Sequence, residues 1–236
     1  MPRVINRCAV HENGCYVKLA QEARLRPAPL PPDLRPPGCA VRVGGRRVCL
    51  AEYALCETKH QALYRRHGFV CNGTQLFYDW KPLRRPLRVP SLAAASSCPT
   101  TQPAGTTGAR GATDIPQGSV FGLGPSYPTL DYEGGRTLVT LDPGDSRGIP
   151  GTKVLWSTPR YHGAVLIRGR QLDGPGTLGF DLGPAWTRTV LPEIRLTGPD
   201  PGLHPAATYA PAAGCYAYQI DTLTSSSLII FDVRIR

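Results

Sequence analysis

The sequence predicts a mainly β protein whose short antiparallel strands form a sandwich or a barrel. From about residue 97 onward, apolar residues recur at every second position, as expected for half-buried strands. In the CYAYQI stretch, for example, Tyr216, Tyr218 and Ile220 share one face. The 26 glycines and 25 prolines favour many short elements joined by turns. No window of useful length in this part of the chain has a competing helical period.

Eight strands are expected in this region, and the last two should form a closing hairpin. Each is a short stretch, and turn signals rich in Gly, Pro and Asp lie between them. The expected strands are residues 120–123, 137–141, 153–157, 164–168, 178–182, 190–196, 215–221 and 226–235.

Charge and cysteine content divide the chain into two parts. Residues 1–92 contain 16 Lys+Arg and 6 Asp+Glu, whereas the remainder contains 11 of each, and six of the eight cysteines lie in the first part. We therefore predict a basic, Cys- and Pro-rich leader over 1–92, a low-complexity linker over 93–113 and the β-domain over 114–236. No apolar run reaches the roughly 18 residues that a membrane-spanning helix needs.

The leader itself contains three recognisable stretches. Residues 24–37 are Pro-rich and predict an extended connector. Residues 39–48 predict a two-stranded ribbon that turns at Gly44 and Gly45. Residues 50–67 are rich in Ala, Leu, Glu, Gln and Arg and predict a helix.

On such a helix Cys56 and His60 would lie at positions i and i+4 on one face. A thiolate and an imidazole in that arrangement are half of a tetrahedral zinc site. The other two ligands would be Cys39 and Cys49, or Cys8 and Cys15. Zinc would then stabilise a stretch that is too small to bury much apolar surface.

The stretch ALCETKHQALYRRHG, residues 54–68, also resembles the helix of small zinc-binding modules of phages and bacteria. The matching positions are Cys56, His60, Arg65, Arg66 and Gly68. The first cysteine pair, in CAVHENGC, departs from that pattern because its gap is wide. The resemblance implies bound zinc, and the basic face of the leader would suit phosphate backbones.

Two other interpretations of residues 1–92 stand beside the zinc hypothesis. One is a disordered leader. The other is a misassigned start, with the true translation start downstream, because Arg outnumbers Lys 23 to 4 and such Arg-, Pro-, Gly- and Ala-rich sequence is what GC-rich DNA encodes in several frames.

The β-domain resembles a family of uncharacterised bacterial exported proteins with an immunoglobulin-like β-sandwich. The resemblance covers residues 97–236 and rests on the order CPTTQP, KVLW, GAVLIRGRQLDGPG, GCYAYQI and LIIFDV. It implies an immunoglobulin-like antiparallel sandwich, a cell-envelope or extracellular setting, and no known reaction. The leader departs from the family, because no signal peptide is found where residues 1–92 stand.

Cys98 and Cys215 fit an exported setting and are a disulfide candidate. Cys98 lies at the start of the domain, and Cys215 opens the penultimate strand. In an oxidising compartment a bridge that encloses so long a loop would stabilise the fold by about 4–5 kcal/mol in the chain-entropy model. In the cytosol the same two cysteines would stay reduced.

Arg168, Arg170 and Asp173 are candidates for a charge cluster at the end of a strand. Such a cluster would either contact an anion or carbohydrate, or hold the turn through an Arg–Asp pair. Nucleophilic catalysis requires a nucleophile, a base and an orienting group. The only histidines of the β-domain, His162 and His204, stand beside no nucleophile motif.

The sequence patterns and the resemblance, which implies an exported, cell-envelope-associated bacterial protein, together predict a non-enzymatic binding or structural module without a cofactor. Its partner would be an unknown protein or cell-envelope ligand. The alternative is an intracellular, cytoplasmic zinc-stabilised nucleic-acid-binding protein with an appended β-sandwich interaction domain. A hydrolase that uses His162 or His204 is the least supported interpretation.

Overall fold

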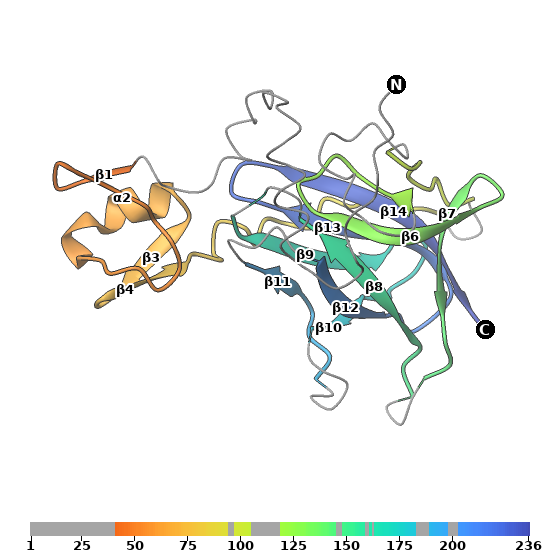
Figure 1. Ribbon diagram of the computed structural model, residues 1–236. Helices are drawn as coiled ribbons and strands as arrows, with labels where there is room; N and C mark the ends of the chain where they lie inside the picture. Colours follow the sequence, from red (N-terminus) through yellow and green to blue (C-terminus); the bar gives the residue numbers. More distant parts are fainter. Residues whose placement is uncertain are drawn as a thin grey trace, which may run out of the picture. The chain divides into compact units, whose positions relative to one another are not determined.

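The computed structural model describes residues 41–93, 97–104, 119–144, 148–158, 161, 163–182, 189–197 and 203–236. All of them belong to one compact unit, Pro32–Arg236. Within this unit a small module precedes a large β-sheet, and Figure 1 labels the elements of both. Among the residues described, no helix is long and apolar enough to cross a membrane.

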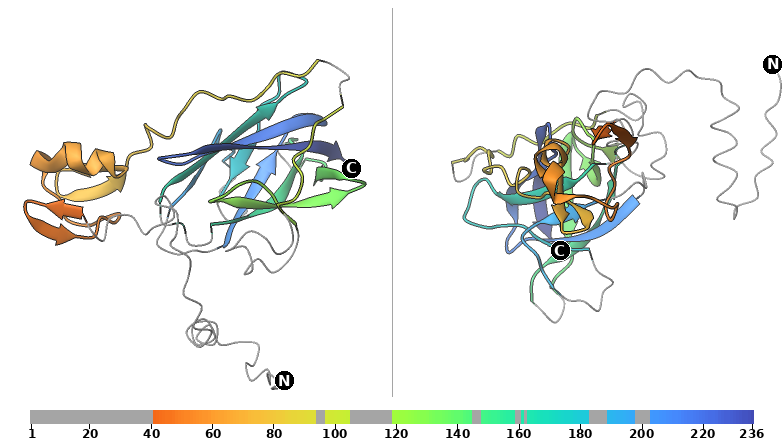
Figure 2. Two further views of the ribbon diagram at one scale, coloured as in Figure 1. Left: turned by 90° about the horizontal axis from the view of Figure 1, so that it is seen from above. Right: turned by 90° about the vertical axis from the view of Figure 1, so that its left-hand side faces the viewer.

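The small module contains two hairpins and one short helical segment, which lie together in Figure 2. Its elements are β1 (Val41–Val43), β2 (Arg46–Val48), the 3-10 helix η2 (Thr58–His60), α2 (Gln61–Arg66), β3 (Phe69–Asn72) and β4 (Gln75–Tyr78). The ribbon predicted over residues 39–48 is confirmed by the pairing of β1 with β2. Gly44 and Gly45 both have positive φ, as a two-residue hairpin turn requires.

The helix predicted over residues 50–67 is wrong in its first half. There the Tyr53 N–H donates to the Leu76 carbonyl at 2.7 Å, and Leu55 forms a β-bridge with Gln75. Residues 53–56 therefore run beside β4 rather than in a helix. Pairing with an existing strand outweighs helix propensity, which contributes only tenths of a kcal/mol per residue.

The large sheet contains ten strands and confirms the prediction of a mainly β protein. They are β5 (Ser119–Val120), β6 (Tyr127–Glu133), β7 (Arg136–Leu141), β8 (Gly151–Ser157), β9 (Val165–Gln171), β10 (Gly179–Asp181), β11 (Ile194–Leu196), β12 (Leu203–Tyr209), β13 (Gly214–Asp221) and β14 (Ser226–Ile235). All eight predicted strands overlap observed ones. The two missed strands, β6 and β12, contain Pro128 and Pro205, and proline interrupts the ordinary strand signal.

The sheet is mixed and nearly closed into a barrel. Its order is β10-β12-β8-β6-β7-β14-β13-β9-β11, with β5 beside β6, and β14 pairs with β7 in parallel. At the remaining gap Leu191 exchanges two hydrogen bonds with Phe180 of β10, and Arg170 of β9 bridges Thr177. An immunoglobulin-like sandwich has two separate antiparallel sheets. The structure shows one mixed sheet instead, so that expectation is not confirmed.

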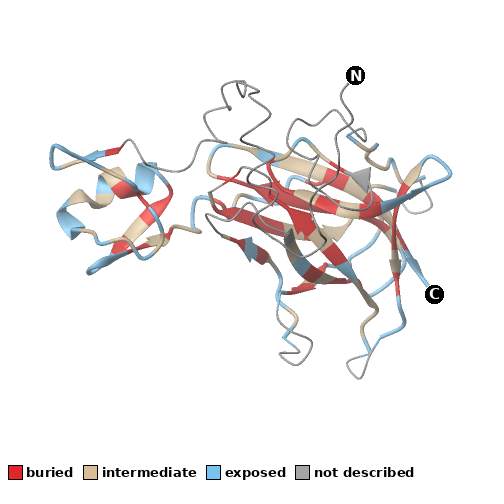
Figure 3. Ribbon diagram, in the orientation of Figure 1, coloured by how far each residue is buried: buried red, intermediate tan, exposed pale blue. Residues whose placement is uncertain are grey.

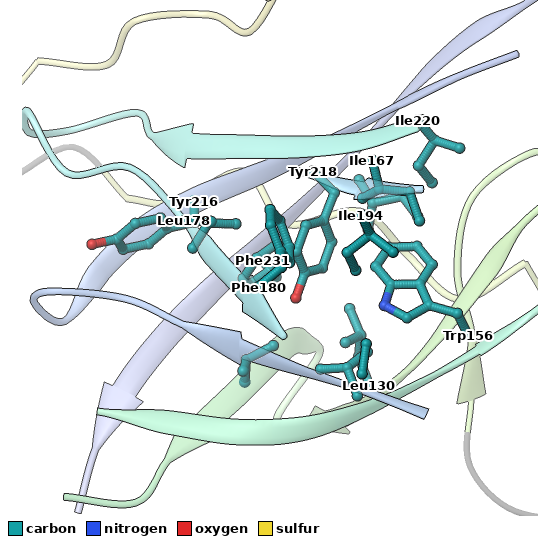
Figure 4. Close-up of a cluster of buried hydrophobic side chains, with 14 of the residues drawn as sticks. Leu130, Trp156, Ile167, Leu178, Phe180, Ile194, Tyr216, Tyr218, Ile220 and Phe231 are labelled. Atoms are coloured by element: carbon teal, nitrogen blue, oxygen red, sulfur yellow. The ribbon is translucent and has the colours of Figure 1, made fainter. Parts of the chain in front are cut away.

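Aromatic side chains fill the interior that the sheet encloses (Figure 4). Tyr218 packs against Phe231 with ring centroids 4.4 Å apart and against the edge of Trp156 at 5.1 Å. Tyr216, Tyr218 and Ile220 all face this interior, as the alternation in their strand predicted. Burial along β13 covers both faces, shown in red in Figure 3. The other face of β13 therefore also has a covering segment.

Residues 97–104, which the sequence analysis assigned to a linker, pack on the sheet. The Thr101 N–H donates to the Ile230 carbonyl at 2.8 Å, and the Ile230 N–H donates to Thr101 Oγ1 at the same distance. Pro103 forms a β-bridge with Phe121. This part of the expected tether therefore belongs to the β-domain.

Candidate functional site: disulfides, a buried charge network and a basic surface

Cys56 forms a disulfide with Cys71, and their Cα atoms are 5.9 Å apart. Cys49 is disulfide-bonded as well. Zinc binds the thiolate, which a disulfide sulfur cannot provide. The predicted zinc set of Cys39, Cys49, Cys56 and His60 is therefore wrong for Cys49 and Cys56, while Cys39 lies outside the described residues.

His60 also lies apart from the position that the zinc hypothesis required. Cys56 precedes the helical segment, so the two side chains do not share a helical turn. The His60 ring instead meets the edge of Tyr64, with centroids 6.3 Å apart. Within the described ranges, no group of three or more His, Cys, Asp or Glu side chains is arranged to hold a metal ion.

A second disulfide joins Cys98 and Cys215, the pair that the sequence predicted, with Cα atoms 5.3 Å apart. It joins the segment before β5 to the outward face of β13. Val89 and Leu172 are buried in the same cluster, which covers this face. The bridge therefore holds residues 97–104 against the sheet.

Arg168 belongs to a buried ion pair, but its partner is not the predicted Asp173. Its Nη2 donates to Asp221 Oδ2 at 2.8 Å and also to the Arg85 carbonyl. The Asp221 side chain is fully buried, and that of Arg168 is 17% exposed. A charge pair this buried is tolerated only where further hydrogen bonds satisfy it.

Gln219 supplies those further bonds and attaches residues 85–88 to the sheet. Its Nε2 donates to both carboxylate oxygens of Asp221, at 3.2 and 2.9 Å, and to the Pro86 carbonyl. Its Oε1 accepts the Arg88 N–H at 2.7 Å. The guanidinium of Arg85 donates to two carbonyls of the β13–β14 turn. The network therefore has a structural role.

Arg170 and Asp173 take separate structural roles. Arg170 donates to the Val89 carbonyl at 3.3 Å and to Ser91 Oγ at 3.4 Å. Asp173 Oδ2 accepts the Cys215 N–H at 3.0 Å. The three predicted residues thus do not form one anion-binding cluster. Gln219 and Asp221 were not predicted, although two polar residues in the apolar strand GCYAYQID are a signal of a buried network.

A second ionic cluster joins the end of the module to β11. Glu193 accepts from Arg84 at 2.8 Å and from Arg195 at 2.7 Å, and the Arg195 guanidinium lies over the Trp80 ring. Burial raises the pKa of Glu193, but the two guanidinium groups outweigh it, so that the pKa is lowered overall. This cluster is also structural.

The cations of the barrel and of the module differ in their surroundings. On the barrel Arg136 and Arg234 lie within 4.0 Å of Asp232, and Arg236 is paired with Asp142. On the module five exposed arginines have no acidic side chain within that distance among the described residues. They are Arg42, Arg46, Arg47, Arg65 and Arg66, and we call them the basic surface.

Two further places in the β-domain combine a cavity with candidate side chains. Thr158 Oγ1 lies 3.1 Å from His204 Nε2, but the small cavity beside this pair has no room for a water molecule. The other candidate histidine, His162, lies outside the described residues. A groove of about 370 Å³ near Leu178, Val190 and Tyr209 is lined largely by apolar side chains. None of the described residues that line this groove is charged.

Comparison of the chain with protein-family models, curated proteins and solved structures finds no match.

Proposed function

We propose that this protein is a non-enzymatic binding or structural module of the cell envelope that works in an oxidising compartment. The disulfides carry this proposal. Cys98–Cys215 joins segments that are 117 residues apart, Cys56–Cys71 closes a loop of 15 residues, and Cys49 is oxidised as well. Stable disulfides of this kind are typical of proteins outside the reducing cytosol.

The charged side chains favour binding over catalysis, because the buried ones serve the fold and the exposed arginines of the module are unpaired among the described residues. The buried pair Arg168–Asp221 and the Glu193 cluster stabilise the attachment of residues 84–88. The basic surface, by contrast, makes no ion pair within the described part of the chain. Unpaired arginines on a surface are suited to recognise an anionic partner.

The proposal is tested by the oxidation state of the protein in the cells that express it. Cells are lysed in alkylating reagent, and the intact mass of the protein is measured before and after reduction. We expect alkyl groups to be gained only after reduction, and a non-reducing digest to yield the linked Cys56–Cys71 and Cys98–Cys215 peptides. Alkylation of these four cysteines without reduction would place the protein in a reducing compartment and refute the proposal.

A further inference from the structure

Three segments of the module meet at one end, which we call the turn end: Gly44-Gly45, residues 55–60 and residues 72–75. A Cβ placed on Gly44 would lie 3.6 Å from His60 Nε2. The Cys56 N–H donates to the Thr74 carbonyl at 2.9 Å, and Leu55 bridges Gln75. Residues 55–60 thus connect the turns of the two hairpins, and these segments form a continuous surface.

The ribbon that reaches the turn end carries a pair of like charges. Arg42 and Arg47 are directly opposite each other across β1 and β2, and both are exposed. The alternate positions, occupied by Val41 and Val48, pack into the module core. Directly opposed like charges destabilise a ribbon, so a bound anion would relieve a cost that is present in the free protein. Arg46 adds a third exposed cation beside the turn.

Exposed apolar side chains lie at the start of the segment that joins the two hairpin turns. Leu55 is 85% exposed, and Tyr53, two residues before it, is 61% exposed. Both side chains project from the segment that runs along β4. The Tyr53 ring meets the edge of Phe77 at 5.5 Å, which holds it in place. A leucine and a tyrosine that are exposed on the same small module as unpaired arginines are suited to the boundary between lipid headgroups and hydrocarbon.

We propose that the turn end docks on an anionic phospholipid membrane. Arg42, Arg46 and Arg47 contact headgroup phosphates, while Leu55 enters the apolar boundary. A nucleic acid or an anionic polysaccharide would satisfy the arginines but offers no hydrocarbon phase for an exposed leucine. This inference rests on the proposed function, because it names the partner of a module that acts at the cell envelope.

The test is sedimentation of the oxidised full-length protein with vesicles. Vesicles of phosphatidylcholine alone are compared with vesicles in which about a third of the lipid is phosphatidylglycerol, at low and at high salt. We expect binding only to the anionic vesicles, and weaker binding at high salt. Each basic residue near an anionic surface contributes roughly 5-fold, so Arg42→Ser/Arg47→Ser should weaken binding about 30-fold. Leu55→Ser should weaken it by about 10-fold.

The matched control is Arg136→Ser/Arg234→Ser, which removes the same two charges from arginines that are paired with Asp232 on the barrel. We expect this variant to bind like the wild type, and thermal unfolding verifies that each variant is folded. Equal weakening by the two double variants would mean that only net charge matters and would overturn the proposal. So would an unchanged affinity of Leu55→Ser, or binding to a single-stranded DNA oligonucleotide without binding to vesicles. If the fully oxidised protein does not bind vesicles, the membrane proposal is refuted but the proposed function is not. If the cysteines are reduced in cells, the proposed function is refuted.

Discussion

At the scale of single residues, the most consequential side chains are Gln219 and Asp221. They alternate along β13 with Tyr218 and Ile220, which face the barrel interior, and so point to the opposite side. On that side, Gln219, Asp221 and Arg168 form a network that holds residues 85–88 against the sheet through hydrogen bonds to their backbone. A buried carboxylate must be paired, because its desolvation costs several kcal/mol.

Removing that carboxylate should therefore be costly. We expect Asp221→Ala to lower the free energy of unfolding by about 3–5 kcal/mol, because Arg168 would be left partly buried without its partner. The control is Asp142→Ala, which breaks the exposed pair with Arg236 and should cost less than about 1 kcal/mol. Urea denaturation measures both variants. Similar losses in the two would contradict a special role for the buried network.

At the scale of elements, residues 97–104 are hydrogen-bonded to the sheet in the manner of an additional short strand. Thr137 N–H donates to Thr100 Oγ1 at 3.2 Å, and Thr101 exchanges hydrogen bonds with Ile230. A segment this short needs an anchor if it is to keep these hydrogen bonds to the sheet. The Cys98–Cys215 bridge provides one at the start of the segment.

The double variant Cys98→Ser/Cys215→Ser should release this segment. We expect a loss of up to about 4–5 kcal/mol of stability in the chain-entropy model, and faster hydrogen exchange at the Ile230 amide. The control, Cys56→Ser/Cys71→Ser, opens a loop of only 15 residues. It should cost about 3 kcal/mol and leave exchange at Ile230 unchanged. Faster exchange at Ile230 in both variants would show that the bridge does not act locally.

The elements also show how far the sequence predicts this fold. The strands with clean period-two patterns, such as β13 and β14, were predicted because alternation follows directly from the pleat. The β3–β4 hairpin was missed, although Asn72-Gly73 is a strong hairpin signal. The partner of Cys56 depends on a pairing between residues 53–56 and β4, which no local pattern encodes. The i, i+4 spacing of Cys56 and His60 therefore predicted a zinc site where the structure has a disulfide.

At the scale of the whole molecule, closure of the barrel depends on contacts that are remote in sequence. The parallel pairing of β14 with β7 and the antiparallel pairing of β12 with β8 both join strands that lie far apart in the chain. Strand alternation predicts which face of a strand is buried but not which strands pair. This is why the sequence left a sandwich and a barrel open, and the immunoglobulin-like sandwich that the resemblance implied is not confirmed.

The same packing predicts how the molecule responds to alkaline pH. Burial raises the pKa of Tyr216 to about 12, and burial together with Glu52 raises that of Tyr78 to about 12. In the unfolded chain both tyrosines ionise near pH 10, so above that pH the unfolded state binds fewer protons than the folded state. The contribution of these two tyrosines to the free energy of unfolding should therefore be fully present below pH 10 and be lost as the pH rises from 10 toward 12. Urea midpoints measured across this window test the prediction, and Tyr78→Phe/Tyr216→Phe should flatten the decline because phenylalanine does not ionise. A decline that is equally steep in the double variant would assign the pH dependence to other groups.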